Sequence, residues 1–241
     1  MLKNFSRAKF DKILIPIAEQ VLDPAQMDHV VFDAYFNNTL MHEFSHGLGP
    51  GTIKLKDGTE STVNRELKDL YSGIEEAKAD ILGLYCTRVL AKEGFFDKTE
   101  ETRGYVCFLP GFFRSIRFGT SSAHGKANLM EFNFFREQGA IEFDAQNEKF
   151  RVVLSKMPEA VEAMASKLLM IEALGDYEGA KAFIDKYAQS SPDLEKLLTK
   201  LKDIPTDFEP FFLAEDYLDV SLRRHLHGRP QTQEPEHEHQ H

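Results

Sequence analysis

The spacing of apolar residues along this chain predicts a mainly helical protein. The clearest pattern runs from about Arg65 to Gly94, where apolar residues recur at intervals of three and four, as on the buried face of an α-helix. The residues of this stripe are Leu70, Ile74, Ala77, Ile81 and Leu84. Further helices are predicted, in chain order, over 127–138, 159–174, 177–187 and 194–201.

Two segments have the pattern of small β-hairpins instead. The first, Thr52–Thr59, turns at Asp57-Gly58, a dipeptide that favours tight hairpin turns. The second runs from Ile141 to Val153, with Asp144–Glu148 as its connection. We therefore expect a mainly α fold with small β-hairpins.

The segment before Gly47 combines a predicted helix with metal-binding chemistry. Residues 33–41 contain neither Pro nor Gly, and the helix is expected to end at the glycines and proline of 47–51. Between these stretches lies the sequence His42-Glu43-Phe44-Ser45-His46. On a helix the two imidazoles leave the same face one turn apart, where they can hold a zinc ion whose bound water Glu43 can reach. The alternative is a surface helix that carries two histidines by chance.

A zinc site of this kind needs a third protein ligand. The helix predicted over 65–94 carries the stretch Glu75-Glu76-Ala77-Lys78-Ala79-Asp80. Glu76 and Asp80 are four residues apart and share a face that borders the apolar stripe. We predict Glu76 as the third ligand, with Asp80 accepting the second N–H of a zinc histidine and Glu75 as a further candidate for that orienting role. The alternative is an ordinary solvated acidic helix face.

Three stretches resemble the dipeptidyl peptidase III family of zinc metallopeptidases. They are His42–Gly47, Glu75–Asp80 and Ala123–Asn128, and their order agrees with the family. Two features depart from its best-known members: the two histidines keep the plain HExxH spacing, without an inserted residue, and Asn128 stands in place of an arginine. The chain therefore looks closer to divergent bacterial relatives. Family members are longer and two-lobed, so the resemblance implies that this chain is the helical, zinc-bearing lobe.

The resemblance implies zinc-dependent hydrolysis of peptide bonds in short peptides, as a dipeptidyl-peptidase-like exopeptidase with one Zn²⁺ per chain. Glu43 would be the general base, and His124 would stabilise the developing oxyanion. One alternative is a zinc-binding interaction module, derived from a peptidase, that has lost catalysis. Another is a helical interaction domain in which the motif is accidental.

Other residues of the middle segment are candidates for substrate binding. Arg114 and Arg117 lie in a stretch rich in Phe and Gly, and a guanidinium can bind a peptide carboxylate or carbonyl through its planar fork. Each arginine could equally be a structural ion-pair partner in so acidic a chain. Asn128 is a third candidate, from its position in the Ala123–Asn128 motif.

Composition narrows the classes of function. With 42% hydrophobic residues and 20 Phe, the 241 residues can bury a substantial core. The formal net charge of −10 argues against nucleic acid or an anionic membrane surface as a partner. No run approaches the ~20 apolar residues of a membrane span, and two cysteines give no disulfide framework.

The two ends of the chain suggest how it is organised. We expect residues 1–228 to form the zinc metallopeptidase domain, as one lobe of a larger protein whose second lobe is encoded upstream. Residues 229–241 are polar and rich in histidine, and are predicted to be a disordered tail. The first residues lack a signal-type apolar segment, so we expect a cytoplasmic location; export stays open if the chain is a fragment.

Overall fold

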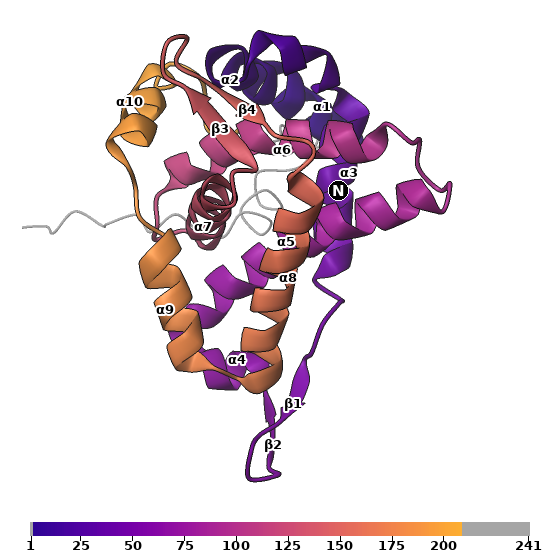
Figure 1. Ribbon diagram of the computed structural model, residues 1–241, viewed down its shortest axis with the longest axis vertical. Coiled ribbons are helices and arrows are strands. Elements are labelled where there is room, and N and C mark those ends of the chain that lie inside the picture. The colour runs from indigo at the N-terminus through magenta and orange to yellow at the C-terminus, as the bar shows by residue number, and fades with distance from the viewer. Residues whose placement is uncertain (1, 209–241) are drawn as a thin grey trace, which may run out of the picture. The chain divides into compact units, whose positions relative to one another are not determined.

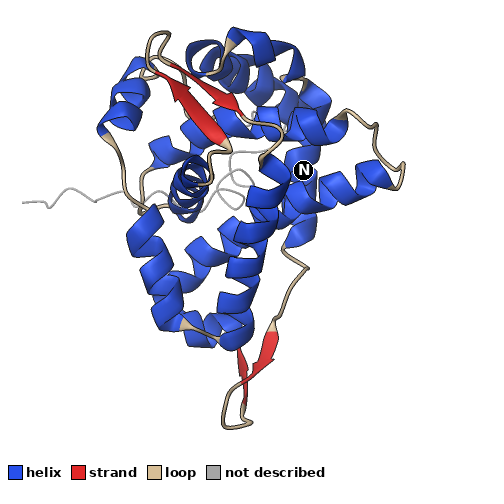
Figure 2. Cartoon of the chain, viewed as in Figure 1, coloured by secondary structure: helices blue, strands red, loops and turns tan. Residues whose placement is uncertain are grey.

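The computed structural model describes residues 2–208 and is mainly helical, which confirms the predicted fold class (Figures 1 and 2). The α-helices are α1 (Lys3–Lys9), α2 (Ile15–Val21), α3 (Phe32–Ser45), α4 (Val63–Leu67), α5 (Tyr71–Lys92), α6 (Glu100–Ser115), α7 (Ala123–Glu137), α8 (Met157–Leu174), α9 (Tyr177–Tyr187) and α10 (Pro192–Lys200). Shorter helical turns cover Phe10–Leu14, Pro24–His29, Lys68–Leu70 and Ile116–Phe118. The tail predicted over 229–241, and residues 209–228 of the predicted domain, lie outside the described residues.

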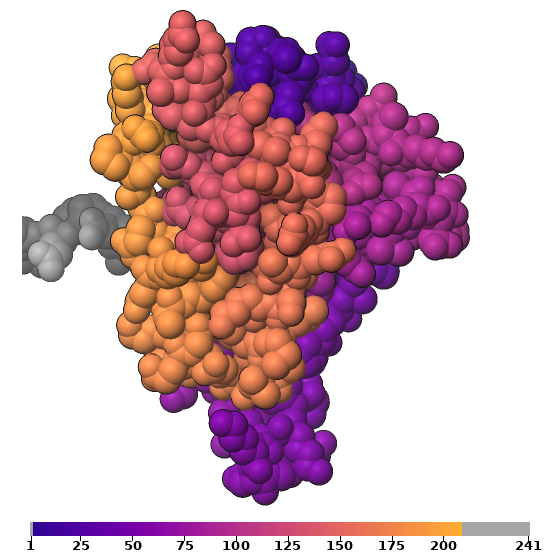
Figure 3. Space-filling view, in the orientation of Figure 1, coloured from indigo at the N-terminus to yellow at the C-terminus, as the bar shows by residue number. Residues whose placement is uncertain are grey.

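The strands form two separate antiparallel hairpins, as the sequence predicted. In the first, β1 (Thr52–Lys54) pairs with β2 (Glu60–Thr62). In the second, β3 (Ile141–Asp144) pairs with β4 (Lys149–Val152). Figure 3 shows the β1–β2 hairpin extending beyond the helices, whereas β3 and β4 lie against the helical body.

The single helix predicted from about Arg65 to Gly94 is wrong at its start. The chain leaves α4 at Lys68, whose φ of 53° is incompatible with a continuing right-handed helix, and a short 3₁₀ turn separates α4 from α5. Neither Gly nor Pro marks this break in the sequence, so the apolar periodicity predicted one continuous helix. The other predicted helices are confirmed with small shifts at their ends, the largest at α7, which begins at Ala123 and so includes His124.

α5 is the central helix of the fold, with α3, α6, α7 and α8 all packed against it. Four of the five predicted stripe residues lie in α5 and are buried, with Ile74, Ala77 and Ile81 fully inaccessible to solvent, whereas Leu70 precedes α5 and is half-buried. Gly83 allows the close approach of α3, because a Cβ there would lie 3.1 Å from the backbone nitrogen of His42. The two helices that carry the predicted metal ligands are therefore in direct backbone contact.

A cluster of phenylalanines anchors α7 beside this pair. The fully buried rings of Phe113 and Phe132 pack edge to face at 5.5 Å between centroids, and Phe150 of β4 contacts both. At the start of α7, a Cβ on Gly125 would lie 2.3 Å from the carbonyl oxygen of Gly119, so only glycine fits. These contacts fix the helix turn that carries His124.

Candidate metal centre

The two histidines of α3 point their Nε2 atoms at each other. These atoms lie 3.1 Å apart, and the rings are nearly perpendicular, at 87°. His42 is buried against α5, whereas His46, at the end of the helix, keeps a third of its side chain exposed. The helical spacing of the motif produces this pair, because residues four apart share one face.

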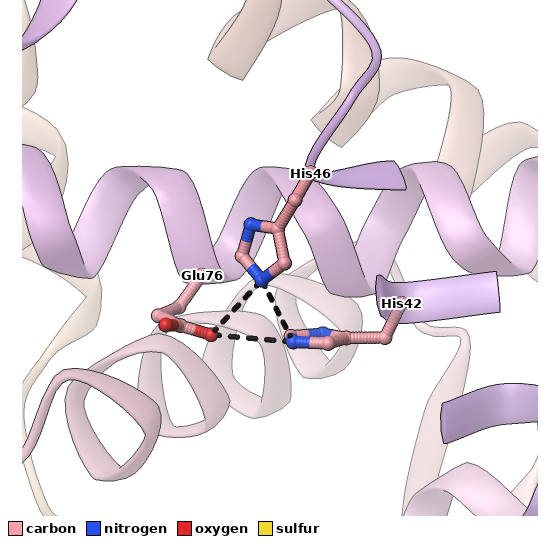
Figure 4. A group of neighbouring side chains, drawn as sticks. All are labelled: His42, His46 and Glu76. Atoms are coloured by element: carbon pink, nitrogen blue, oxygen red, sulfur yellow. Dashed lines mark hydrogen bonds and ion pairs between the residues drawn. The ribbon is translucent and has the colours of Figure 1, made fainter. Parts of the chain in front are cut away.

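Glu76 of α5 completes a group of three potential ligands (Figure 4). Its Oε2 atom lies 3.4 Å from Nε2 of His42 and 3.9 Å from Nε2 of His46. Oε2 is buried. Ligands placed tetrahedrally at about 2.0–2.1 Å from zinc are separated by about 3.3–3.4 Å. The separations of 3.1 and 3.4 Å are close to this value, and that of 3.9 Å between Glu76 and His46 is longer.

Two carboxylates occupy the other side of each histidine ring. Nδ1 of His42 lies 2.7 Å from Oδ1 of Asp80, and Nδ1 of His46 lies 2.9 Å from Oε1 of Glu75. When each Nδ1–H donates to its carboxylate, the Nε2 lone pairs face each other and Oε2 of Glu76. Three electron-rich atoms then converge on one point, which only a cation can stabilise. The donor set therefore fits a metal ion.

The pKa of His42 also indicates that this site stabilises positive charge. Burial, the largest single effect, lowers its pKa, but the hydrogen bonds to Asp80 and Glu76 outweigh it and raise the pKa to about 10. Conversely, burial raises the pKa of Glu76, and the three neighbouring histidines bring it below its ordinary value. The site thus favours a bound positive charge.

Glu43 and His124 border the same site. Nε2 of His124 lies 3.1 Å from Oε2 of Glu76, and its ring stacks on that of His42 at 5.9 Å between centroids. More than half of the His124 side chain is exposed. Glu43 is also exposed and, with His42 and His124, lines a cavity of about 180 Å³ between α3, α6 and α7. The structure therefore brings both predicted catalytic residues to the edge of the ligand group.

The two arginines predicted to bind substrate differ in position. Arg114 lines this cavity, and its Nη2 donates to Oδ2 of Asp207 at 3.1 Å. Arg117 is not among the residues that line the cavity. Its guanidinium donates to the backbone carbonyls of Leu201, Ile204 and Pro205. The structure thus brings Arg114 near the ligands, whereas Arg117 holds the chain that follows α10.

Asn128 lines the same cavity, although its side chain is largely buried. Its Nδ2 donates to Oδ2 of Asp80 at 2.8 Å and to Oε2 of Glu131 at 3.0 Å. Since both amide hydrogens are used in this way, only the amide oxygen of Asn128 is left for a substrate. The structure places Asn128 in the support of His42 through Asp80, and its role in substrate binding stays a prediction.

Sequence reasoning missed three buried charged side chains around the ligands. Glu131 and Glu172 have no exposed surface, and Lys78 is 2% exposed. Nζ of Lys78 donates to Oε1 of Glu75 and to the carbonyl of Leu48, both at 2.8 Å. A usable signal was present for Glu131, which interrupts an otherwise apolar stretch of α7.

Glu172 of α8 lies next to Glu75. Burial is the main cause that raises the pKa of Glu172; Lys78 lowers it, the Glu75 carboxylate raises it, and the net pKa is about 8. Burial also raises the pKa of Glu75, but its hydrogen bonds with Lys78 and His46 bring it below its usual range. Glu172 is therefore the protonated partner of an ionised Glu75.

In the part of the chain that the structure describes, no helix is both long enough and apolar enough to cross a membrane.

Two solved structures of dipeptidyl peptidase III are similar to this chain in fold and in sequence. A dipeptidyl peptidase III structure from Caldithrix abyssi superimposes with a TM-score of 0.86 and 45% sequence identity, covering 90% of this chain and 41% of that protein. The structure of dipeptidyl-peptidase III from Corallococcus sp. strain EGB gives a TM-score of 0.86 and 40% identity, covering 90% of this chain and 40% of that protein.

A curated relative bears a different name. Nudix hydrolase 3 of Arabidopsis thaliana is 42% identical over 218 residues, which are 89% of this chain and 28% of the relative. No family model matches the chain. By their names, these relatives are all hydrolases, and this chain spans less than half of each.

Proposed function

We propose that this chain, whose resemblance to the dipeptidyl peptidase III family the two solved structures confirm, is the zinc-bearing lobe of a metallopeptidase. In this proposal one Zn²⁺ is held by His42, His46 and Glu76. The reaction is hydrolysis of peptide bonds in short peptides, in the manner of a dipeptidyl-peptidase exopeptidase. Residues 1–228 form the domain, a second lobe completes the larger protein, and the location is cytoplasmic.

The convergence of Nε2 of His42, Nε2 of His46 and Oε2 of Glu76 carries this proposal. These atoms lie within 4.8 Å of one another, and each histidine has a carboxylate on its Nδ1. A catalytic zinc site has three protein ligands of this type and leaves a position open. The exposed Glu43 and His124 at the edge of the group are the further residues that hydrolysis requires.

Each residue has a defined task in the proposed reaction. Zinc, when bound, supplies Lewis acidity and lowers the pKa of a water molecule to about 7. Glu43 accepts a proton from the attacking water and later passes it to the leaving amine. His124 donates an N–H to the carbonyl oxygen of the scissile bond as negative charge develops there. Asp80 and Glu75 keep the Nδ1 protons on His42 and His46.

A non-catalytic zinc-binding interaction module is the alternative. It has the same metal chemistry but needs no general base, so Glu43 distinguishes the two. The name of the Arabidopsis relative describes another hydrolase, and this chain corresponds to only 28% of that protein. The peptidase proposal has the support of two structures that match 90% of this chain.

The proposal is tested by measuring zinc content and peptide hydrolysis on the same preparations. Residues 229–241 are removed first, because their histidines could bind metal adventitiously. We expect one zinc per parent chain and hydrolysis that a chelator abolishes. Glu43→Gln is expected to keep the zinc and lose nearly all hydrolysis. The same two measurements are repeated on any longer form of the protein, as parent and as Glu43→Gln variant. If both bind zinc and neither hydrolyses peptides, the result would favour the interaction module.

A further inference from the structure

Glu131 lies behind the metal ligands without touching them. It belongs to α7, has no exposed surface, and is surrounded in sequence by Leu129, Met130 and Phe132, which are also buried. Its Oε2 accepts a hydrogen bond from Asn128 at 3.0 Å, and the same amide nitrogen donates to Asp80 at 2.8 Å. Asp80 in turn accepts the Nδ1–H of His42. A continuous hydrogen-bonded chain therefore links Glu131 to a proposed ligand.

The surroundings of Glu131 favour its neutral form. Burial raises its pKa well above the ordinary range, and the charge and hydrogen bond of Asp80 raise it further, against the opposing effect of Asn128. Its second oxygen, Oε1, is buried, and no N–H or O–H of another described residue donates to it. An oxygen in this position suits the hydroxyl of a carboxylic acid, which needs an acceptor rather than a donor. Asp80, which shares the amide nitrogen of Asn128 with Glu131, is the acceptor that this arrangement offers.

We propose that Glu131 is a positioning residue of the metal centre, which as a neutral carboxylic acid donates a hydrogen bond to Asp80 and so fixes the orientation of His42. This inference rests on the zinc site of the proposed function. It adds a residue that contacts neither metal nor substrate and that neither HExxH nor the Glu75–Asp80 motif contains.

The three hydrogen bonds that the Asp80 carboxylate would accept have two physical consequences. With donors from His42, Asn128 and Glu131, its carboxylate cannot rotate, so the imidazole of His42 is held with Nε2 toward Glu76. The carboxylate of Asp80 is also held as an acceptor toward His42, so the proton stays on Nδ1 of His42 and the Nε2 lone pair is available.

A structural role and a positioning role for Glu131 predict different effects of the same substitutions. A leucine would fill a similar volume but would leave one N–H of the buried Asn128 without an acceptor, which costs stability. A purely structural role therefore predicts a lower melting temperature with unchanged zinc affinity, whereas the positioning role predicts weaker zinc binding.

The test measures zinc affinity, by competition with a chromophoric chelator, together with the melting temperature of the metal-free protein. Glu131→Leu removes the donor, and Glu131→Gln keeps it, since an amide can accept from Asn128 and donate to Asp80. The matched control is Glu159→Gln, an exposed carboxyl group in the first turn of α8. All three are compared with the parent chain.

We expect Glu131→Leu to weaken zinc binding by about 10-fold, the lower end of the range for residues that orient a ligand. Its metal-free melting temperature should also fall, because Asn128 loses an acceptor, whereas Glu131→Gln should keep the melting temperature of the parent. Glu131→Gln and the control should bind zinc within about twofold of the parent, a change of less than about 0.5 kcal/mol. Parent-like zinc affinity in Glu131→Gln together with weaker affinity in Glu131→Leu is the key result. Neither a negatively charged Glu131 nor a purely structural one predicts it.

Two results would overturn the inference while leaving the proposed function standing. One is parent-like zinc affinity in Glu131→Leu, which would show that the donor is dispensable. The other is a zinc affinity of Glu131→Gln as weak as that of Glu131→Leu, which would show that Asp80 needs no neutral donor. If the Leu variant fails to fold, the comparison of Glu131→Gln with the parent decides the matter. A parent chain that binds no zinc would remove the inference and the proposed zinc site together.

Discussion

The Nε2 atoms of His42 and His46 lie 3.1 Å apart while a carboxylate accepts at the Nδ1 position of each ring. Two neutral imidazoles in this arrangement direct their lone pairs at each other, so the contact is repulsive without a positive charge. The arrangement therefore favours a cation between the two Nε2 atoms. Oε2 of Glu76 is the third atom placed to contact that cation.

The first prediction concerns the two histidines. His42→Ala and His46→Ala should each abolish stoichiometric zinc binding, because the two remaining protein ligands cannot hold the ion in a site of this type. Elemental analysis of chains without residues 229–241 measures this directly. His29→Ala is the control, since His29 lies outside the ligand group and should leave zinc content unchanged. Full zinc occupancy in His42→Ala would contradict the assignment.

The second prediction separates a ligand from an orienting carboxylate. Glu76→Ala should lose the metal, whereas Asp80→Ala should weaken zinc affinity by about 10- to 100-fold without removing the site. Asp28→Ala, at an exposed carboxylate, controls for the loss of negative charge. If competition titrations gave Asp80→Ala the affinity of the parent, Asp80 would not be orienting His42.

The third prediction concerns the contact between α3 and α5. A Cβ at position 83 would lie 3.1 Å from the nitrogen of His42 and 3.2 Å from the carbonyl carbon of Met41. Gly83→Ala should therefore lower the free energy of unfolding by about 1–3 kcal/mol, the usual cost of overpacking, and weaken zinc binding as the helices separate. Denaturant unfolding and chelator competition report the two effects.

The matched control for Gly83 is Gly111→Ala in α6, where an added Cβ meets no atom within 4 Å. It should leave the free energy of unfolding unchanged or raise it by up to about 1 kcal/mol, since alanine is the better helix former. Equal stability of the two alanine variants would show that the close approach of α3 and α5 does not depend on glycine.

The fourth prediction is a pH dependence from Glu172. Burial raises its pKa to about 8 from an ordinary value of 4.5, so between these values the folded chain keeps a proton that the unfolded chain releases. The contribution of Glu172 to stability is therefore full below about pH 4.5 and is lost as the pH rises towards 8. Glu172→Gln, which cannot ionise, should remove this loss.

The measurement for Glu172 is thermal unfolding of the metal-free protein at several pH values between about 5 and 8. The difference in melting temperature between Glu172→Gln and the parent should grow in favour of the variant as the pH rises. Curves that stay parallel across this range would show that Glu172 is ionised in the folded state, beside Glu75 and Lys78.

The fifth prediction is about what this chain does alone. All proposed ligands and the base lie between His42 and Glu76, so the isolated chain should be folded and zinc-loaded. It spans 41% and 40% of the two peptidase structures, and holding a peptide in a near-attack geometry can supply ~7–11 kcal/mol of a barrier. We therefore expect weak hydrolysis with little preference among di- to octapeptides, compared with a longer native form. Efficient release of dipeptides by these 241 residues would show that the substrate cleft is complete within them.

Local sequence determined the elements and the central part of the candidate site. The periodicity of apolar residues predicted α5 and α8, and the Asp57-Gly58 turn predicted the first hairpin, because both patterns depend on neighbours along the chain. The pairing of His42 with His46 follows in the same way from helical spacing. The break at Lys68 escaped this reasoning, since no Gly or Pro marks the positive φ there.

Only the tertiary structure decided what surrounds that pair. The sequence could not tell that Gly83 admits α3 against α5, that α7 contributes Asn128 and Glu131 behind Asp80, or that α8 contributes Glu172 behind Glu75. Periodicity establishes which face of a helix is buried, but it does not identify the distant helix that covers the face. The ligands could thus be found from local spacing, whereas the buried acids that hold them in place depend on contacts between segments far apart in the chain.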